Sequence, residues 1–218
     1  MKKTLLALIA LTLLSVASFA QVSITVTNNA NAVRKNETVQ VDWTEVAKLN
    51  PGLNPEMIAV KENGRILAHQ LVDSNSDGKP DRLVFQVDFA ANEKMKTISV
   101  ESSTTKPSFP NRTFGRFVPE RMDDFAWEND RVAFRTYGKT LEKELVSSGI
   151  DVWSKRTRDL IINEWYKAGD AFYHTDNGKG LDFYSVKKSR GCGGAGIWDG
   201  KKLHVSRNFV SYKVIANG

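Results

Sequence analysis

The amino-acid sequence predicts a mainly β protein with few short helices, and three observations support this prediction. Apolar and polar residues alternate along several stretches of residues 21–101, which is the period of a half-buried strand. Asn63-Gly64 separates two of these stretches and is a strong hairpin signal. A segment rich in Ser, Thr and Pro follows at 102–119. We therefore expect a small N-terminal antiparallel β-sandwich over 21–103 and a second module over 104–218.

Residues 1–20 are typical of a secretory signal peptide. Two lysines precede the apolar run 4–14, and small residues at positions 18 and 20 predict cleavage before Gln21. The run is too short for a comfortable membrane span. We therefore expect an exported protein, periplasmic or secreted, that has no stable membrane insertion.

Composition and charge are those of an ordinary globular chain. The 218 residues include 31 basic and 25 acidic side chains, which gives a net charge of +6. This mild excess suits an anionic partner, but the basic residues form no block of the kind that binds nucleic acid. The single cysteine, Cys192, excludes an intramolecular disulfide.

The spacing of apolar residues predicts where helices and strands lie in the two modules. A short helix is expected at 159–166, where apolar residues lie near helical spacing. A final strand is expected at 208–216, followed by an Asn217-Gly218 turn whose partner strand is missing, so the sequence resembles part of a longer protein. In the first module the alternating stretches predict strands at 22–27, 38–43, 57–62, 65–72, 83–89 and 96–100.

A turn in the first module has the oxygen spacing of a calcium loop. Asp73, Asn75, Asp77 and Asp81 alternate around Gly78, which permits a sharp turn. Strands flank this loop instead of the helices of an EF-hand. It is therefore a candidate structural calcium site, and the alternative is a solvated hairpin tip without an ion. The sequence indicates no other cofactor.

The segment 127–138 is the densest group of polar and aromatic residues. If it forms one strand, Arg131 and Arg135 lie on one face, where two guanidinium groups can grip a carboxylate or sulfate. Glu128 and Asp130 would lie on the opposite face. The alternative is a salt-bridged strand within a large sheet.

Two later segments add titratable groups. Asp151, Trp153 and Lys155 would share one strand face. The loop 173–184 holds one imidazole, which can exchange a proton near neutral pH, together with carboxylates and phenols. We assign structural roles to His69, His204 and Cys192, and close backbone packing to the glycines near position 193. The candidate residues of this loop are Tyr173, His174, Asp176 and Tyr184.

Several of these segments together resemble the family described as domain of unknown function 4861 (DUF4861). The motifs are WENDRVAFRTYG, SGIDVW, GxGLDFY, GCGGxGIWDGKKL and NFVSYKVIANG, and the likeness covers essentially the whole chain after residue 20. The resemblance implies an exported protein of polysaccharide degradation, similar to oligosaccharide dehydratases of ulvan breakdown. It also implies that the second module is the first part of a β-supersandwich of the galactose-mutarotase type. Family members are about twice as long as this chain.

The implied reaction removes water from a uronic acid at the non-reducing end of an oligosaccharide, which needs a cation, a base and an acid. From their chemistry we assign the cation role to Arg131 and Arg135, the base to His174, and the acid to Tyr184 or Tyr173. A glycoside hydrolase that uses a carboxylate pair and a non-catalytic carbohydrate-binding module remain alternatives. The residues expected to contact the sugar are Trp127, Glu128, Asp130, Trp153, Lys155 and Asp176.

Overall fold

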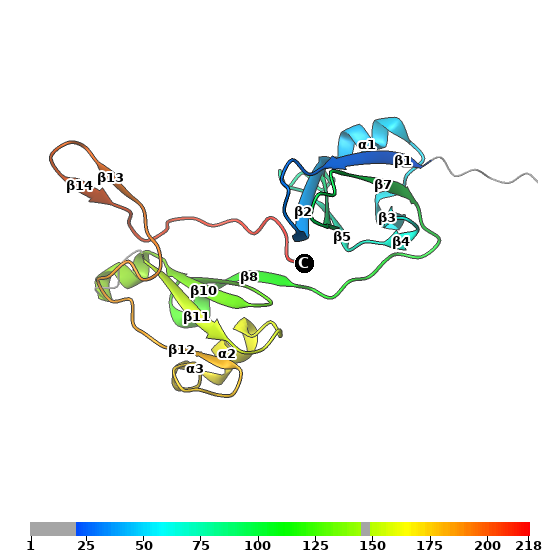
Figure 1. The fold of residues 1–218 in the computed structure, drawn as a ribbon. Coiled ribbons are helices and arrows are strands. Elements are labelled where there is room, and N and C mark those ends of the chain that lie inside the picture. The colour runs from blue at the N-terminus through cyan, green and yellow to red at the C-terminus, as the bar shows by residue number, and fades with distance from the viewer. Residues whose placement is uncertain (1–20, 145–148) are drawn as a thin grey trace, which may run out of the picture. The chain divides into compact units, whose positions relative to one another are not determined.

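The computed structural model describes residues 21–144 and 149–218, so the predicted signal peptide lies outside the described residues. The model confirms a mainly β fold with several antiparallel sheets and few short helices (Figure 1). The chain divides into two compact units. Among the described residues, one unit comprises 21–69 and 84–107, and the other comprises 70–83 and 108–218.

The first unit contains a four-stranded sheet in which the predicted alternation is realised. Its order is β1 (Val22–Thr27), β7 (Met95–Ser102), β3 (Ile58–Glu62) and β4 (Arg65–Ile66). The two residues between β3 and β4, Asn63 and Gly64, have φ angles of 49° and 79°. Positive φ at both positions is the geometry of a type I′ turn, so the predicted hairpin is confirmed.

A three-stranded sheet has the order β2 (Arg34–Asp42), β6 (Arg82–Phe89) and β5 (His69–Val72). Two sequence predictions are corrected around it. The strand expected at 65–72 is split into β4 and β5. The strand expected at 38–43 ends at Asp42, whose side chain accepts a hydrogen bond from the Thr44 backbone N–H and caps helix α1 (Trp43–Leu49). A 3-10 turn, η1, spans Pro55–Met57.

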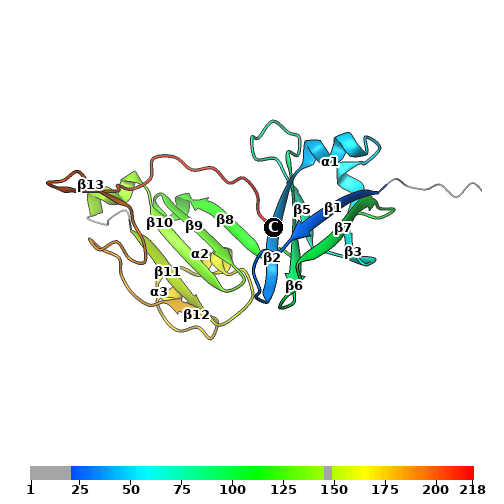
Figure 2. The same cartoon turned by 45° about the horizontal axis from the view of Figure 1, so that its top comes forward.

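The second unit is built on a five-stranded antiparallel sheet, whose strands lie side by side in Figure 2. We considered one strand across 127–138, but this segment contains the end of one strand, a turn and a second strand. The Asn129 side chain accepts hydrogen bonds from the backbone N–H groups of Arg131 and Val132, which closes a turn between two strands. The sheet order is β12 (Gly180–Asp182), β11 (Ile150–Lys155), β10 (Val132–Tyr137), β9 (Asp124–Asn129) and β8 (Thr113–Val118).

Two short helices, α2 (Ile162–Ala168) and α3 (Asp170–Tyr173), cover one face of this sheet (Figure 1). The helix expected at 159–166 is thus present, and it starts a few residues later. Trp153 of β11 stacks on Trp165 at 5.3 Å and on Tyr173 at 5.1 Å, measured between ring centroids. These rings form the centre of the second unit's core. The 3-10 turns η2 (Pro119–Arg121) and η3 (Lys139–Glu144) flank the sheet.

The opposite face of the sheet meets the C-terminal segment, which follows the hairpin of β13 (Gly196–Trp198) and β14 (Leu203–Val205). The strand expected at 208–216 is not formed. Only Phe209 makes a β-bridge, to Gly138. Side chains and separate backbone hydrogen bonds hold the segment instead: Tyr212 stacks on Phe117 with ring centroids 4.8 Å apart, Asn217 accepts a hydrogen bond from the Gly115 N–H, and the Gly218 N–H donates to the Thr113 backbone oxygen at 3.2 Å.

Candidate functional site

The helix-covered face of the five-stranded sheet carries charged side chains as well as apolar ones. The period of two places Asp124, Glu128 and Arg135 on this face, and the β10–β11 register sets Arg135 directly opposite Asp151. All four residues are buried. Buried charges are costly unless they are paired, so each of these side chains needs a partner of opposite charge.

Arg135 lies at the centre of this buried charge cluster, with 3% of its side chain exposed. Its Nη2 donates to Asp151 Oδ2 at 2.6 Å and to Asp182 Oδ2 at 2.7 Å. Its Nη1 donates to the Tyr173 hydroxyl at 3.3 Å. The guanidinium also lies 5.2 Å from the ring centroid of Trp153. One cation therefore organises two carboxylates and a phenol.

Each of the two carboxylates has one buried oxygen that accepts no hydrogen bond from the described residues. Among the described residues, neither Asp151 Oδ1 nor Asp182 Oδ1 has a hydrogen-bond partner, although both atoms are buried. A buried acceptor without a partner indicates a bound proton, water or ligand. Burial raises the pKa of Asp182 to about 6 against the lowering effect of the Arg135 cation, and the Asp151 carboxylate raises it further.

The buried charge cluster reaches the surface through three side chains. His174 Nδ1 lies 3.2 Å from the Asp182 backbone oxygen and 3.5 Å from Asp182 Oδ2, while 38% of the His174 side chain is exposed. Its Nε2 lies 3.7 Å from Asp170 Oδ2. Arg121, 31% exposed, donates to Asp124 Oδ2 at 2.8 Å and to Asp170 Oδ1 at 3.4 Å. We call His174, Asp170 and Arg121 the mouth of the cluster.

Hydrogen bonding tunes the acids at this mouth. Although partial burial disfavours the Asp170 anion, the hydrogen bond from Tyr173 and the charge of Arg121 lower the pKa of Asp170. Burial and the same hydrogen bond raise the pKa of Tyr173 to about 12. Tyr173 is therefore a neutral donor and Asp170 an anion at neutral pH.

The structure brings together three of the residues expected to be catalytic, Arg135, Tyr173 and His174. The other two lie elsewhere. Arg131 is in the turn between β9 and β10, and the Tyr184 hydroxyl donates to the Ile150 backbone oxygen at 3.1 Å. Asp182, Asp170 and Arg121 were not among the site residues predicted from the sequence. Asp151 was named there only among several carboxylates without an assigned role.

The residues expected to contact sugar are dispersed. Trp153 is fully buried in the core, and Trp127 lies on the opposite sheet face, where it stacks on Phe134 at 5.4 Å. Asp130 and Asp176 form surface ion pairs with arginines. Glu128 binds Lys155 at 2.7 Å and accepts the first backbone N–H groups of helix α2. Glu128 and Lys155 thus hold the helix that covers the buried charge cluster.

The acidic loop at 73–81 is closed by its own backbone. The Asp73 carboxylate accepts hydrogen bonds from the N–H groups of Ser76, Asp77 and Gly78, and Asp81 accepts from Ser74. Within 21–144 and 149–218, no group of three metal-ligating side chains lies close enough to hold a metal ion. Calcium binding by Asp73, Asn75, Asp77 and Asp81 therefore stays a prediction.

The residues expected to be structural have local partners or lie at the surface. His69 Nδ1 lies 2.8 Å from the Leu67 backbone oxygen, and His204 Nε2 lies 2.7 Å from Asp199 Oδ2. Cys192 is exposed.

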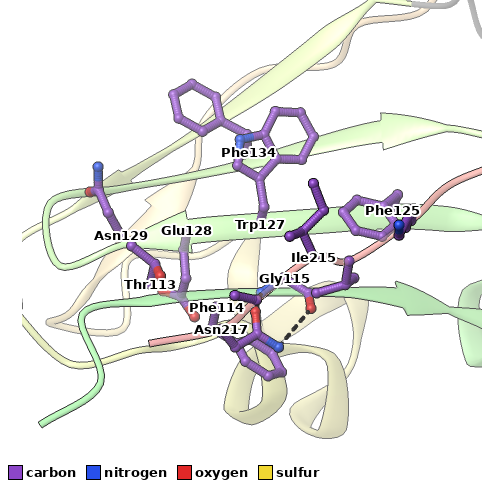
Figure 3. Close-up of a pocket in the computed structure, with 13 residues that line it drawn as sticks. Thr113, Phe114, Gly115, Phe125, Trp127, Glu128, Asn129, Phe134, Ile215 and Asn217 are labelled. Carbon is purple, nitrogen blue, oxygen red and sulfur yellow. Dashed lines mark hydrogen bonds between the residues drawn. The ribbon is translucent and has the colours of Figure 1, made fainter. Parts of the chain in front are cut away.

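A groove of about 430 Å³ lies between the apolar sheet face and the C-terminal segment (Figure 3). The Trp127 and Phe134 rings stand on its sheet side, and Asn217 donates to the Gly115 backbone oxygen at its edge. Such an aromatic groove can accept an apolar or sugar face.

The pKa of Asp182 leads to a testable pH dependence. Because the folded state holds this proton up to about pH 6 and the unfolded chain releases it near the ordinary value of 3.8, the group stabilises the fold fully below about pH 4 and loses this contribution as the pH rises to about 6. Carboxyl ¹³C NMR is expected to show an inflection near pH 6 that Asp182→Asn removes. An inflection below pH 4 would contradict the buried geometry.

Comparison with known proteins gives two matches. The family model described as "Domain of unknown function (DUF4861)" matches residues 26–218. "Uncharacterized protein P7" of Formosa agariphila is 36% identical over 210 residues, which cover 89% of this chain and 53% of that protein. The chain thus spans about half the length of this relative. No solved structure matches. Among the described residues, no helix has the length and apolar character needed to cross a membrane.

Proposed function

This chain belongs to the DUF4861 family, and from that premise we propose that it is an exported protein of polysaccharide degradation that removes water from uronate-containing oligosaccharides. The observation that supports the proposal most is the mouth of the buried charge cluster. It offers a half-exposed imidazole, backed by a buried carboxylate with a pKa of about 6 and flanked by an arginine. This chain spans about half the length of the Formosa agariphila protein. The activity of a protein of that full length is therefore part of the proposal as well.

Arg121 is the cation of the mouth that a substrate carboxylate can reach, because 31% of its side chain is exposed, whereas Arg135 is 3% exposed and is paired with Asp151 and Asp182. Pairing with a guanidinium lowers the negative charge on the uronate and acidifies its C5–H bond. We therefore transfer the cation role from Arg131 and Arg135 to Arg121. Arg135 acts as a positioning residue that holds Asp182 and Tyr173 in place.

His174 takes the C5 proton in this proposal. The electron pair of the broken C5–H bond forms the C4–C5 double bond, and the C4–O bond breaks. The imidazolium returns the same proton to the departing hydroxyl, which leaves as water, and the product is a 4,5-unsaturated uronate. Asp182, beside Nδ1, stabilises the imidazolium and fixes its orientation.

The test uses the full chain and oligosaccharides that end in a uronic acid. The dehydration predicts a rise in ultraviolet absorbance from the conjugated product and a mass loss of one water. New reducing ends without this absorbance would instead identify a glycoside hydrolase. If neither product appears with any uronate-ended oligosaccharide, the dehydration proposal is wrong for this chain.

The groove of Figure 3 favours a second candidate, a carbohydrate-binding module without catalysis. Its stacked Trp127 and Phe134 rings offer an apolar platform for a sugar face. Binding that persists in His174→Ala but is lost in Trp127→Ala, with no turnover in either protein, would select this candidate.

A further inference from the structure

A second charged pocket lies at one end of the five-stranded sheet, outside the buried charge cluster. It has a volume of about 210 Å³ and is formed by the β9–β10 turn and the residues around the end of β11. We call it the arginine pocket. Its lining residues are Asp130, Arg131, Lys155, Arg156, Thr157 and Arg158.

The negative charge of the carboxylate in the arginine pocket does not neutralise the positive charge of the surrounding cations. Asp130 Oδ2 accepts from Arg112 Nη1 and from Arg158 Nη1, each at 3.1 Å, so one negative charge serves two guanidinium groups. Although burial opposes the Asp130 anion, both arginines lower the pKa of Asp130, which keeps it charged at neutral pH. Lys155 adds no free charge, because its buried ammonium is paired with Glu128.

The remaining donors of the pocket are available to a ligand. Among the residues that the structure describes, the Arg131 guanidinium has no ion-pair or hydrogen-bond partner, while its backbone N–H is fixed by Asn129. The Thr157 hydroxyl accepts the Asp159 N–H at 3.1 Å and can still donate its own proton. Arg156 is paired with Asp176 at the rim. The pocket therefore presents guanidinium forks and a hydroxyl around an excess of positive charge.

We propose that the arginine pocket binds an oxyanion, a sulfate ester or a carboxylate carried by an oligosaccharide. Planar guanidinium groups bind such oxyanions through two parallel hydrogen bonds, which surface lysines cannot do. The identification of the anion as a sugar substituent rests on the proposed function, whereas oxyanion binding itself does not. Arg131 lies four residues along the chain from Arg135 and comes directly before β10.

The experiment measures binding without turnover. Inorganic sulfate, a sulfated uronate disaccharide and its desulfated form are titrated by calorimetry into the wild-type chain and into Arg131→Gln/Arg158→Gln. The matched control is Lys201→Gln/Lys202→Gln, which removes the same charge from the exposed β13–β14 hairpin. We expect the arginine double variant to lose at least ~10-fold in affinity and the control to keep wild-type affinity.

The disaccharide pair distinguishes the two sources of the anion. Tighter binding of the sulfated form assigns the pocket to sulfate, and equal binding assigns it to the carboxylate; both results support the proposal. Equal affinity losses in the two double variants would show that net charge alone causes the loss, and this result would overturn the proposal. Tighter binding of a short DNA than of either sugar, lost in the arginine variant, would also overturn it. Because inorganic sulfate needs no sugar site, failure of the dehydration assay leaves this test intact.

Discussion

Replacing Arg135 by methionine is expected to lower the free energy of unfolding by about 3–5 kcal/mol, because the change leaves the Asp151 and Asp182 carboxylates buried without their shared cation. Each of these carboxylates already holds one oxygen without a partner, and the other donors to Asp151 Oδ2, the Tyr137 hydroxyl and the Trp153 indole N–H, carry no charge. The measurement is denaturant unfolding at neutral pH, followed by tryptophan fluorescence, since Trp153 and Trp165 lie in the core beside the cluster.

Two controls separate the buried charge from the loss of a side chain. Arg112→Met breaks the exposed pair with Asp130, where 64% of the arginine side chain is in solvent, and is expected to cost less than about 1 kcal/mol. The triple variant Arg135→Met, Asp151→Asn and Asp182→Asn removes the stranded charges and is expected to recover a large part of the loss. A cost for Arg135→Met as small as that for Arg112→Met would show that the buried pairs do not support the fold.

The strands of the first unit could be predicted because their signal is local. In β1, β6 and β7 the more buried apolar residues lie at every second position, so the period of the strand can be read from the sequence itself. Helix α1 was missed because Trp43 continues the apolar alternation of β2, and only the capping bond from Asp42 shows that the chain turns there. The cap favours a helix where the alternating pattern favours a strand. Packing of the buried Trp43 and Val46 side chains stabilises the helix.

The candidate site was harder to predict because it depends on strand register. Arg135 and His174 were found from the density of polar and aromatic residues around them. Asp182 is brought to Arg135 by the pairing of β12, a strand of only three residues, with β11, and no local pattern encodes that pairing. Arg131 was grouped with Arg135 because the turn that Asn129 forms around Arg131 was not recognised. That turn places Arg131 at the end of the sheet, whereas Arg135 lies within β10 and is buried.

His174→Ala is expected to lower kcat/KM for dehydration of a uronate-ended oligosaccharide by at least ~100-fold, if the chain has the proposed activity, because general base catalysis contributes roughly 10²–10⁴-fold. The residue has the required position: its ring is partly open to solvent, and one nitrogen faces the Asp182 backbone and carboxylate oxygens. Product formation is followed by ultraviolet absorbance, and folding of the variant is checked by the unfolding transition used for Arg135.

His204→Ala is the matched control, since this imidazole is paired with Asp199 on the exposed β13–β14 hairpin and is expected to leave the rate unchanged. Added imidazole should restore part of the rate to His174→Ala and none to a variant that has merely lost its fold. Asp182→Asn tests the positioning role separately: it is expected to lower kcat and to remove an inflection near pH 6 from the pH profile, because the pKa of the Asp182 carboxyl itself is about 6. Wild-type turnover in His174→Ala would show that another group takes the proton. Asp182 and Arg135 would then have structural roles only.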